Sequence, residues 1–78
     1  MNQEDVVLTI KKAARDLFRK YGYNKTSVNE LAKQARISKA TFYKIFPSKE
    51  LILHEVLMDY IRENVEDILN TSTKDLDL

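Results

Sequence analysis

The sequence has no cysteine, and this absence excludes several classes of protein. Without cysteine, neither a disulfide framework nor a thiolate metal site can form. With only one histidine, His54, a histidine-rich metal site is excluded as well. The absence of cysteine leaves the redox compartment open while fitting a cytoplasmic protein. We therefore expect no metal and no cofactor.

Long apolar runs are also missing. No stretch approaches the about 20 apolar residues that a helix needs to cross a bilayer. The first residues, 1–5, are polar and acidic, unlike a signal sequence. No nucleophile–base pair, phosphate loop or metal cluster can be assembled from the residues present. We expect neither a membrane protein nor an enzyme.

Glycine and proline occur once each, as Gly22 and Pro47, so few residues interrupt helix formation. A chain of 78 residues makes one small domain at most. The apolar residues recur at steps of three and four, which predicts an all-α fold of four helices. We place them at about 4–21, at 28–35, from Ser38 to just before Pro47, and from Ser48 to about residue 70, with a polar tail or linker at 71–78.

Each helix has its own apolar face and end signals. In the first helix the inward residues are Val7, Ile10, Ala14, Leu17, Phe18 and Tyr21. Gly22 should end it in a left-handed conformation, with Tyr23 folded back on Phe18. Ser27 and Glu30 have capping-box spacing at the start of the second helix. Its inward residues are Val28, Leu31, Ala32 and Ala35.

The third helix is cationic and carries hydroxyl groups beside its lysines. Ser38 caps it, Phe42 and Phe46 supply its inward side, and Pro47 stops it. Ser48 caps the fourth helix, whose apolar residues are Leu53, Val56, Leu57, Tyr60, Ile61, Ile68 and Leu69. The second and third helices together have the form of a helix-turn-helix that fits a DNA major groove.

Charge is divided unevenly along the chain. Residues 1–49 hold eleven basic residues against four acidic ones, whereas residues 50–78 hold two against eight. Five of the basic residues fall between Lys33 and Lys49. Such segregation presents a basic face to an anionic partner, for which nucleic acid is the natural candidate.

Three motifs in order resemble the DNA-binding domain of TetR-type transcriptional repressors. They are Leu17-Phe18-x-x-Tyr21-Gly22-Tyr23, then Thr26-Ser27-Val28-x-x-Leu31-Ala32-x-x-Ala35, then Ser38-Lys39-Ala40-Thr41-Phe42-Tyr43-x-x-Phe46-x-Ser48-Lys49-Glu50. The resemblance covers about residues 6–57. It implies a homeodomain-like three-helix head, residues 1–50, whose third helix is the recognition helix at about 39–46, followed by a connecting helix at 51–70.

The resemblance also implies a set of residues that contact a double-stranded DNA operator. These are Thr26, Ser27, Arg36, Ser38, Lys39, Ala40, Thr41, Tyr43, Lys44 and Lys49. Arg36 and Ala40 stand where the family usually has glycine. A non-glycine residue in a left-handed turn costs on the order of 1 kcal/mol. Either the turn is therefore reshaped or Arg36 tolerates the strain.

In the family, a C-terminal domain binds a small inducer and forms the homodimer. We expect that domain to be missing here, which would leave a monomer or a weakly associating chain. Small-molecule inducer binding and the homodimer are thus implied only for a full-length protein.

Several of these residues also have a purely structural interpretation. Lys39 and Lys44 can be ordinary solvated lysines, and Thr26 and Ser27 can be helix caps. The stripe of Glu55, Asp59, Glu63 and Asp67 is expected to be a solvated face, with Arg62 paired to Asp59 or Glu66. The competing function is a helical protein-interaction module that uses the apolar face of the fourth helix.

Overall fold

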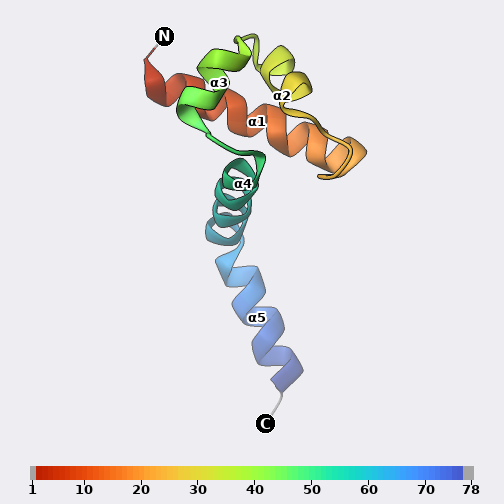
Figure 1. The fold of residues 1–78 in the computed structure, drawn as a ribbon. Helices are drawn as coiled ribbons and strands as arrows, with labels where there is room; N and C mark the ends of the chain where they lie inside the picture. Colours follow the sequence, from red (N-terminus) through yellow and green to blue (C-terminus); the bar gives the residue numbers. More distant parts are fainter. Residues whose placement is uncertain (1, 77–78) are drawn as a thin grey trace.

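The computed structural model describes the backbone of residues 2–76 and the side chains of residues 2–70. This part of the chain is all helical, as predicted. Three helices form a head: α1 (Gln3–Tyr21), α2 (Val28–Ala35) and α3 (Lys39–Ile45). Two more, α4 (Lys49–Glu63) and α5 (Val65–Leu76), lead away from the head (Figure 1).

Short polar residues cap the first four helices. The side chains of Asn2, Ser27, Ser38 and Ser48 each accept a hydrogen bond from the amide three residues later, at 2.9, 3.1, 3.0 and 3.3 Å. Each cap satisfies an amide that has no partner within its helix. The three serine caps are confirmed. Glu30 also reaches back as predicted, and its carboxylate accepts the Ser27 hydroxyl at 3.1 Å.

The end of α1 differs from the prediction in one respect. Gly22 has φ 89° and ψ 157°, so its φ is positive but its ψ is extended rather than left-handed helical. Essentially only glycine adopts this region. The Gly22 amide donates to the Phe18 carbonyl at 2.9 Å. The Tyr23 ring packs edge-on against Phe18, as predicted, with centroids 5.4 Å apart.

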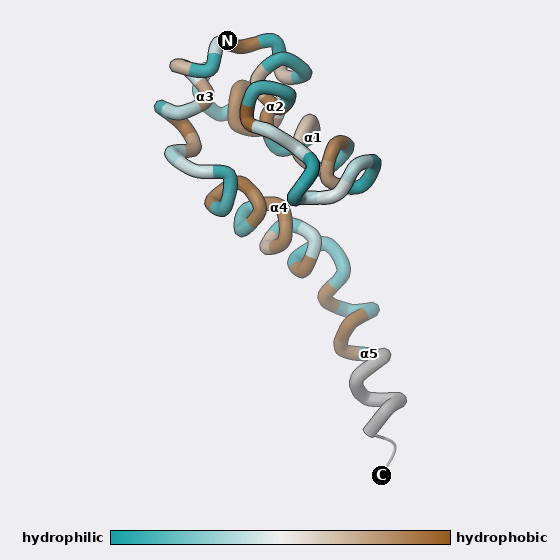
Figure 2. Tube along the Cα trace, turned by 45° about the vertical axis from the view of Figure 1, so that its right-hand side comes forward, coloured by the Kyte–Doolittle hydropathy of each residue, from teal (hydrophilic) through white to brown (hydrophobic). Residues whose placement is uncertain are grey.

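One core joins α1, α2, α3 and α4. Its buried residues are Ile10, Ala13, Ala14, Leu17, Leu31, Ala32, Ala35, Phe42, Phe46 and Ile52. Figure 2 shows hydrophobic residues recurring along each helix of the head and along α4. The predicted inward position of Tyr21 is wrong, because this side chain is 49 % exposed. Tyr21 is the last residue of α1.

The fourth helix was expected to reach Asn70, but α4 ends at Glu63. At Asn64 the backbone leaves the helical conformation, with φ −119° and ψ 18°. The Tyr60 carbonyl accepts both the Asn64 side-chain amide at 2.8 Å and the Asn64 main-chain amide at 3.1 Å. α5 then continues to Leu76, so most of the segment expected to be a polar tail is helical. Residues 77 and 78 lie outside the described part.

Three members of the acidic stripe, Glu55, Asp59 and Glu63, lie on α4 and pair with cations of α1, but only Asp59 is largely covered, and Glu63 stays exposed as expected. Lys11 lies 2.8 Å from Asp59 and 4.0 Å from Glu55, and Arg15 lies 3.4 Å from Glu63. Arg62 pairs with Asp59 at 3.3 Å, as expected. The Lys11 hydrogen bond, with the charges of Lys11, Arg62 and Arg15, holds the pKa of Asp59 below its usual value.

None of the helices in the described residues is both long enough and apolar enough to span a membrane.

Leu31 is fully buried in the core, so we expect truncation of its side chain to destabilise the fold strongly. Leu31→Ala should lower the free energy of unfolding by about 2–5 kcal/mol, through lost apolar burial and the cavity left behind. Thermal and urea unfolding followed by circular dichroism measure it. The control is Leu57→Ala on α4, where the leucine is 50 % exposed and the expected change is within about 0.5 kcal/mol. Equal losses for the two variants would contradict this core.

The pairing of Lys11 with Asp59 predicts a pH dependence. Because the pKa of Asp59 is lowered in the folded state, its contribution to stability is present above the unfolded value of about 3.9 and is lost as the pH falls through the folded value. Asp59→Asn should therefore melt a few degrees below the wild type at pH 7. The difference should shrink below about pH 4.

The control for that experiment is Asp16→Asn, at an exposed position on α1. Its melting temperature should follow the wild type at every pH. A difference between Asp59→Asn and the wild type that stays constant from neutral to acidic pH would show that the ion pair does not stabilise the fold.

Candidate nucleic-acid interface

The outward side of α3 is set by what its other side buries. Phe42 is fully buried and Phe46 is 6 % exposed, as the predicted inward stripe requires. A helix that buries one face presents the remaining positions to solvent. Exposed on the outward side are Lys39, Ala40, Tyr43 and Lys44, with Thr41 half-buried among them. Five of the predicted contact residues are therefore brought together on one helix.

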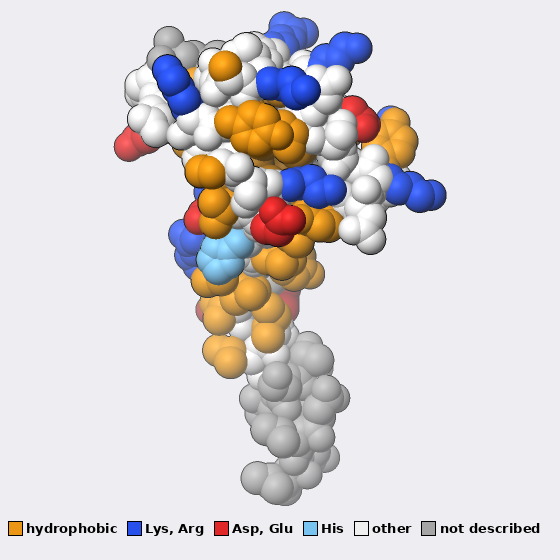
Figure 3. All heavy atoms as spheres, in the orientation of Figure 1, with side chains coloured by type: hydrophobic (Ala, Val, Ile, Leu, Met, Phe, Trp, Pro, Cys, Tyr) orange, Lys and Arg blue, Asp and Glu red, His pale blue; other side chains and the backbone are white. Residues whose placement is uncertain are grey.

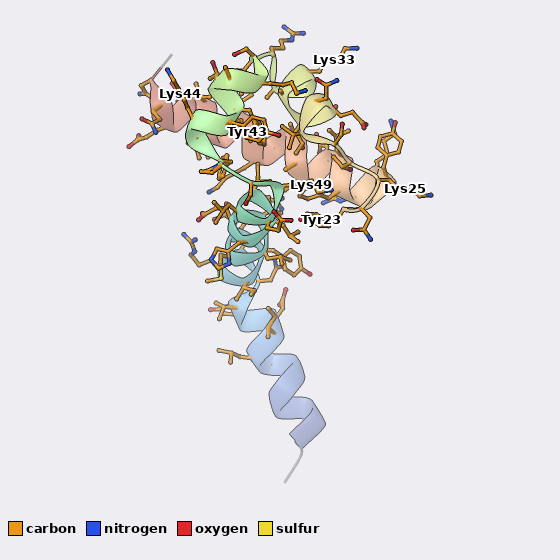
Figure 4. The ribbon with its side chains drawn as sticks, in the orientation of Figure 1. Tyr23, Lys25, Lys33, Tyr43, Lys44 and Lys49 are labelled. Atoms are coloured by element: carbon orange, nitrogen blue, oxygen red, sulfur yellow. The ribbon has the colours of Figure 1, made fainter. Side chains whose placement is uncertain are left out.

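Basic side chains surround this helix on the face shown in Figures 3 and 4. Tyr43 lies near the middle of the face, 46 % exposed, with Lys44 on one side and Lys33 and Lys25 toward the other. Figure 3 shows several lysine and arginine side chains gathered around the head in this view. A duplex has a phosphate on each strand at short, regular intervals, so a spread of cations over one face suits it.

Sequence reasoning missed Lys25 as a candidate. It is exposed and lies directly before the loop residues Thr26 and Ser27. Its position beside a helix N-terminus is the signal that could have found it, because helix starts attract phosphates. Lys33 was part of the basic cluster but not of the predicted contact set.

Ser38 does more than cap α3. Its hydroxyl accepts the Thr41 amide at 3.0 Å and lies 3.0 Å from the Thr41 hydroxyl, to which it donates. This pair holds Thr41 in one orientation one turn into α3. A short hydroxyl side chain at that position can reach a base edge in the major groove.

The turn between α2 and α3 keeps its shape despite the arginine. Arg36 is left-handed, with φ 61° and ψ 42°. Its amide donates to Lys33 at 3.1 Å, and the Ile37 amide donates to Ala32 at 3.0 Å. These two bonds form a Schellman motif. Of the two alternatives, Arg36 therefore tolerates the strain, and the turn is not reshaped.

The predicted role of the Thr26 side chain in DNA contact is wrong. Thr26 is 1 % exposed, and its hydroxyl donates to the carbonyls of Gly22 at 2.8 Å and Leu17 at 3.3 Å. A hydroxyl inside the fold with two such acceptors cannot meet a phosphate. Ser27, next along the chain, is exposed and caps α2. It can combine the cap with a phosphate contact.

Lys49 also differs from the expected solvent-facing lysine. Its ammonium donates to the carbonyls of Tyr23 at 2.8 Å and Thr26 at 2.9 Å, and lies 4.2 Å from the centroid of the Tyr23 ring. Burial, followed by the nearby Glu50 carboxylate, raises the pKa of the Tyr23 phenol. The phenol is therefore neutral at physiological pH.

Comparison with known proteins agrees with this geometry. The family model described as bacterial regulatory proteins, tetR family, matches residues 10–56, from within α1 to within α4. The chain belongs to the TetR family. The match spans all of α2 and α3, including the turn at Arg36, so the TetR family resemblance found in the motifs is confirmed.

Two curated TetR relatives share this region. The chain is 48% identical over 63 residues to the uncharacterized HTH-type transcriptional regulator YuxN of Bacillus subtilis, across 81% of this chain and 22% of the relative. It is 39% identical over 57 residues to the HTH-type transcriptional regulator QacR of Staphylococcus aureus, across 73% of this chain and 29% of the relative. The chain thus spans less than a third of the length of these relatives. No solved structure gave a significant match.

The strained turn predicts that glycine at position 36 stabilises this TetR-family head. Arg36→Gly should raise the free energy of unfolding by about 0.5–1 kcal/mol, because relief of the left-handed strain exceeds the added entropy of the unfolded chain. The control, Arg36→Ala, removes the same charge but keeps the strain and should give no gain. Denaturant titration measures both variants. A stabilising Arg36→Ala would show that the charge, rather than the backbone, limits stability.

Proposed function

We propose that this chain is a sequence-specific DNA-binding head of a TetR-type regulator, which acts as a repressor by occupying an operator. The observation that carries the proposal is the outward side of α3. It presents a half-exposed tyrosine, an oriented threonine and two exposed lysines on a helix that is anchored by buried Phe42 and Phe46. These groups are suited to phosphates and base edges, and α3 is the second helix of the helix-turn-helix.

The proposed contacts divide into two kinds. Lys44, Ser27 and Lys25 toward the sides of the face, and the Tyr43 hydroxyl near its middle, suit phosphate oxygens, which position the protein without reading sequence. Lys39 and Thr41 lie in the first turn of α3 and suit base edges. Ala40, which is small and exposed, allows close approach to the groove. Arg36 and Ser38 flank the start of α3 and complete the proposed set.

The distribution of charge supports DNA binding by the head rather than by α4. The acidic side chains of α4 pair with Lys11 and Arg15 on α1, so these two cations are neutralised within the fold. Lys25, Lys33, Lys39 and Lys44 make no ion pair within the described part of the chain and remain available to a polyanion.

The partners of a complete regulator follow from the same proposal. Two heads held together in a homodimer would place their recognition helices in successive major grooves of a palindrome. Dimerisation and inducer binding would belong to a further domain. The domain limits, with a head at 1–50 and a connecting segment after it, remain part of this proposal. The site of action would be the cytoplasm, where bacterial DNA lies.

A set of point variants tests this function. Lys44→Ala and Tyr43→Phe should weaken binding to every duplex alike, whereas Thr41→Ala should change the preference at one or two base positions by about 1–3 kcal/mol. Fluorescence anisotropy with labelled duplexes, and selection from a random duplex pool, measure the two effects. Wild-type affinity should fall steeply between about 50 and 200 mM salt.

Two outcomes would contradict the proposal. Binding that does not depend on salt would favour the alternative, a helical interaction module that uses the exposed apolar side chains of α4, such as Leu57 and Ile61. A site-selection profile unchanged by both Thr41→Ala and Lys39→Ala would show that the outward side of α3 does not read the bases.

A further inference from the structure

Lys49 differs from the other lysines near the proposed DNA face. Lys25, Lys33, Lys39 and Lys44 are exposed, and none has an ion pair or side-chain hydrogen bond within the described residues. The Lys49 side chain is half-buried and donates two short hydrogen bonds to main-chain carbonyls. An ammonium has three N–H donors, so only one is left for any other acceptor.

The carbonyls that Lys49 binds belong to the loop between α1 and α2. Tyr23 and Thr26 lie 26 and 23 residues before Lys49 in the sequence, so these bonds tie the start of α4 to a distant turn. The Tyr23 ring covers the ammonium at 4.2 Å, in a cation–π contact. The Tyr23 ring itself is fixed against Phe18. The ammonium is therefore held by two carbonyls and an aromatic ring together.

Thr26, within the same loop, connects it to the end of α1. The Thr26 hydroxyl donates to Gly22 and Leu17 at the end of α1, and the Thr26 amide donates to the Tyr23 carbonyl at 3.2 Å. The loop is thus fixed to α1 by a hydroxyl and to α4 by an ammonium. It leads directly into Ser27, the cap of α2, and it carries Lys25.

We propose that Lys49 is a positioning residue that clamps the 22–27 loop, and that it acts on DNA through Ser27 and Lys25 rather than by contacting a phosphate. This proposal rests on the proposed DNA-binding function. Because α4 follows α3 after only Phe46, Pro47 and Ser48, a bond from Lys49 to the loop fixes the distance between the start of α2 and the end of α3. The start of α2 and the end of α3, which both face phosphates in the proposed complex, are thereby held at a fixed distance from each other.

The clamp requires a compact ammonium. A guanidinium is planar and larger, with its donors in a rigid fork, so in the space that the Lys49 ammonium fills it does not keep the same geometry to the two carbonyls and the ring. A phosphate contact, by contrast, is made as well by arginine as by lysine. Lys49→Arg therefore separates the two roles without changing charge, and Lys49→Met removes the charge while keeping an unbranched stem.

The first experiment uses the unaltered 78-residue chain without DNA. Nuclear magnetic resonance of the lysine ammonium groups in 15N-labelled protein should show a Lys49 signal that is protected from water exchange, with side-chain protons shifted by the Tyr23 ring. Lys44 should show neither effect. A Lys49 ammonium that exchanges as fast as that of Lys44 would overturn the clamp. This measurement requires neither a variant that folds nor a DNA complex.

The second experiment measures duplex affinity over a series of salt concentrations, at a temperature where circular dichroism shows each variant fully folded. Lys49→Met and Lys49→Arg should both weaken binding by about tenfold, with the slope of log K against log[salt] unchanged. The same two substitutions at Lys44 should behave differently. Lys44→Met should reduce the slope by about 0.9, and Lys44→Arg should bind DNA with wild-type affinity.

The outcomes distinguish failure of the clamp from failure of the proposed function. Wild-type affinity in Lys49→Arg, together with a reduced slope in Lys49→Met, would show a direct phosphate contact. Unchanged affinity in both Lys49 variants would show that the clamp does not position DNA-binding groups. If the wild type shows no salt-dependent DNA binding at all, the DNA-binding function is wrong, while the ammonium measurement still decides whether the loop is clamped.

Discussion

Burial of Phe42 in the core shared by α1, α2, α3 and α4 is the constraint on which the remaining structure depends. A helix of seven residues has too few internal hydrogen bonds to be stable alone, so α3 exists because its aromatic face is buried with Leu31, Ile10 and Ile52. The same burial fixes the rotation of α3 about its axis. The exposed positions of Lys39, Tyr43 and Lys44 follow from that rotation, and so the chemistry of the face follows from the packing beneath it.

Polar interactions then fix the helix ends and the angles between helices, which the small core alone does not set. The four caps define where helices begin, and the Schellman motif at Arg36 sets the angle at which α3 leaves α2. Ion pairs between Lys11 and Asp59 and between Arg15 and Glu63 hold α4 against α1. Exposed ion pairs are individually weak, and these two act together within about one turn of α4. Asp59 and Glu63 thereby serve to orient α4 against α1.

The 22–27 loop illustrates how one short segment can join folding to function. It is tied to α1 through the Thr26 hydroxyl at the Leu17 carbonyl and to α4 through the Lys49 ammonium, and it ends at the cap of α2. Two residues that the family pattern marks as DNA contacts thus make internal bonds in this chain. Matching a motif position to a role by type alone does not show where the side chain points, because lysine and threonine serve equally well as surface groups and as internal donors.

The sequence by itself determined the helices of the head, their serine caps and the inward stripes of Leu31 and Phe42, because these depend on local spacing and on short-range hydrogen bonds. It also determined the family, through the order of its motifs. It could not determine the break at Asn64, where the backbone leaves the helical conformation although the apolar spacing favours one continuous helix. Nor could it determine the contacts of Asp59 with Lys11, of Thr26 with Leu17 and of Lys49 with Tyr23, whose partners lie nine to forty-eight residues away along the chain. Only the tertiary structure decided which of the polar residues face solvent, since that depends on contacts between helices that no local pattern encodes.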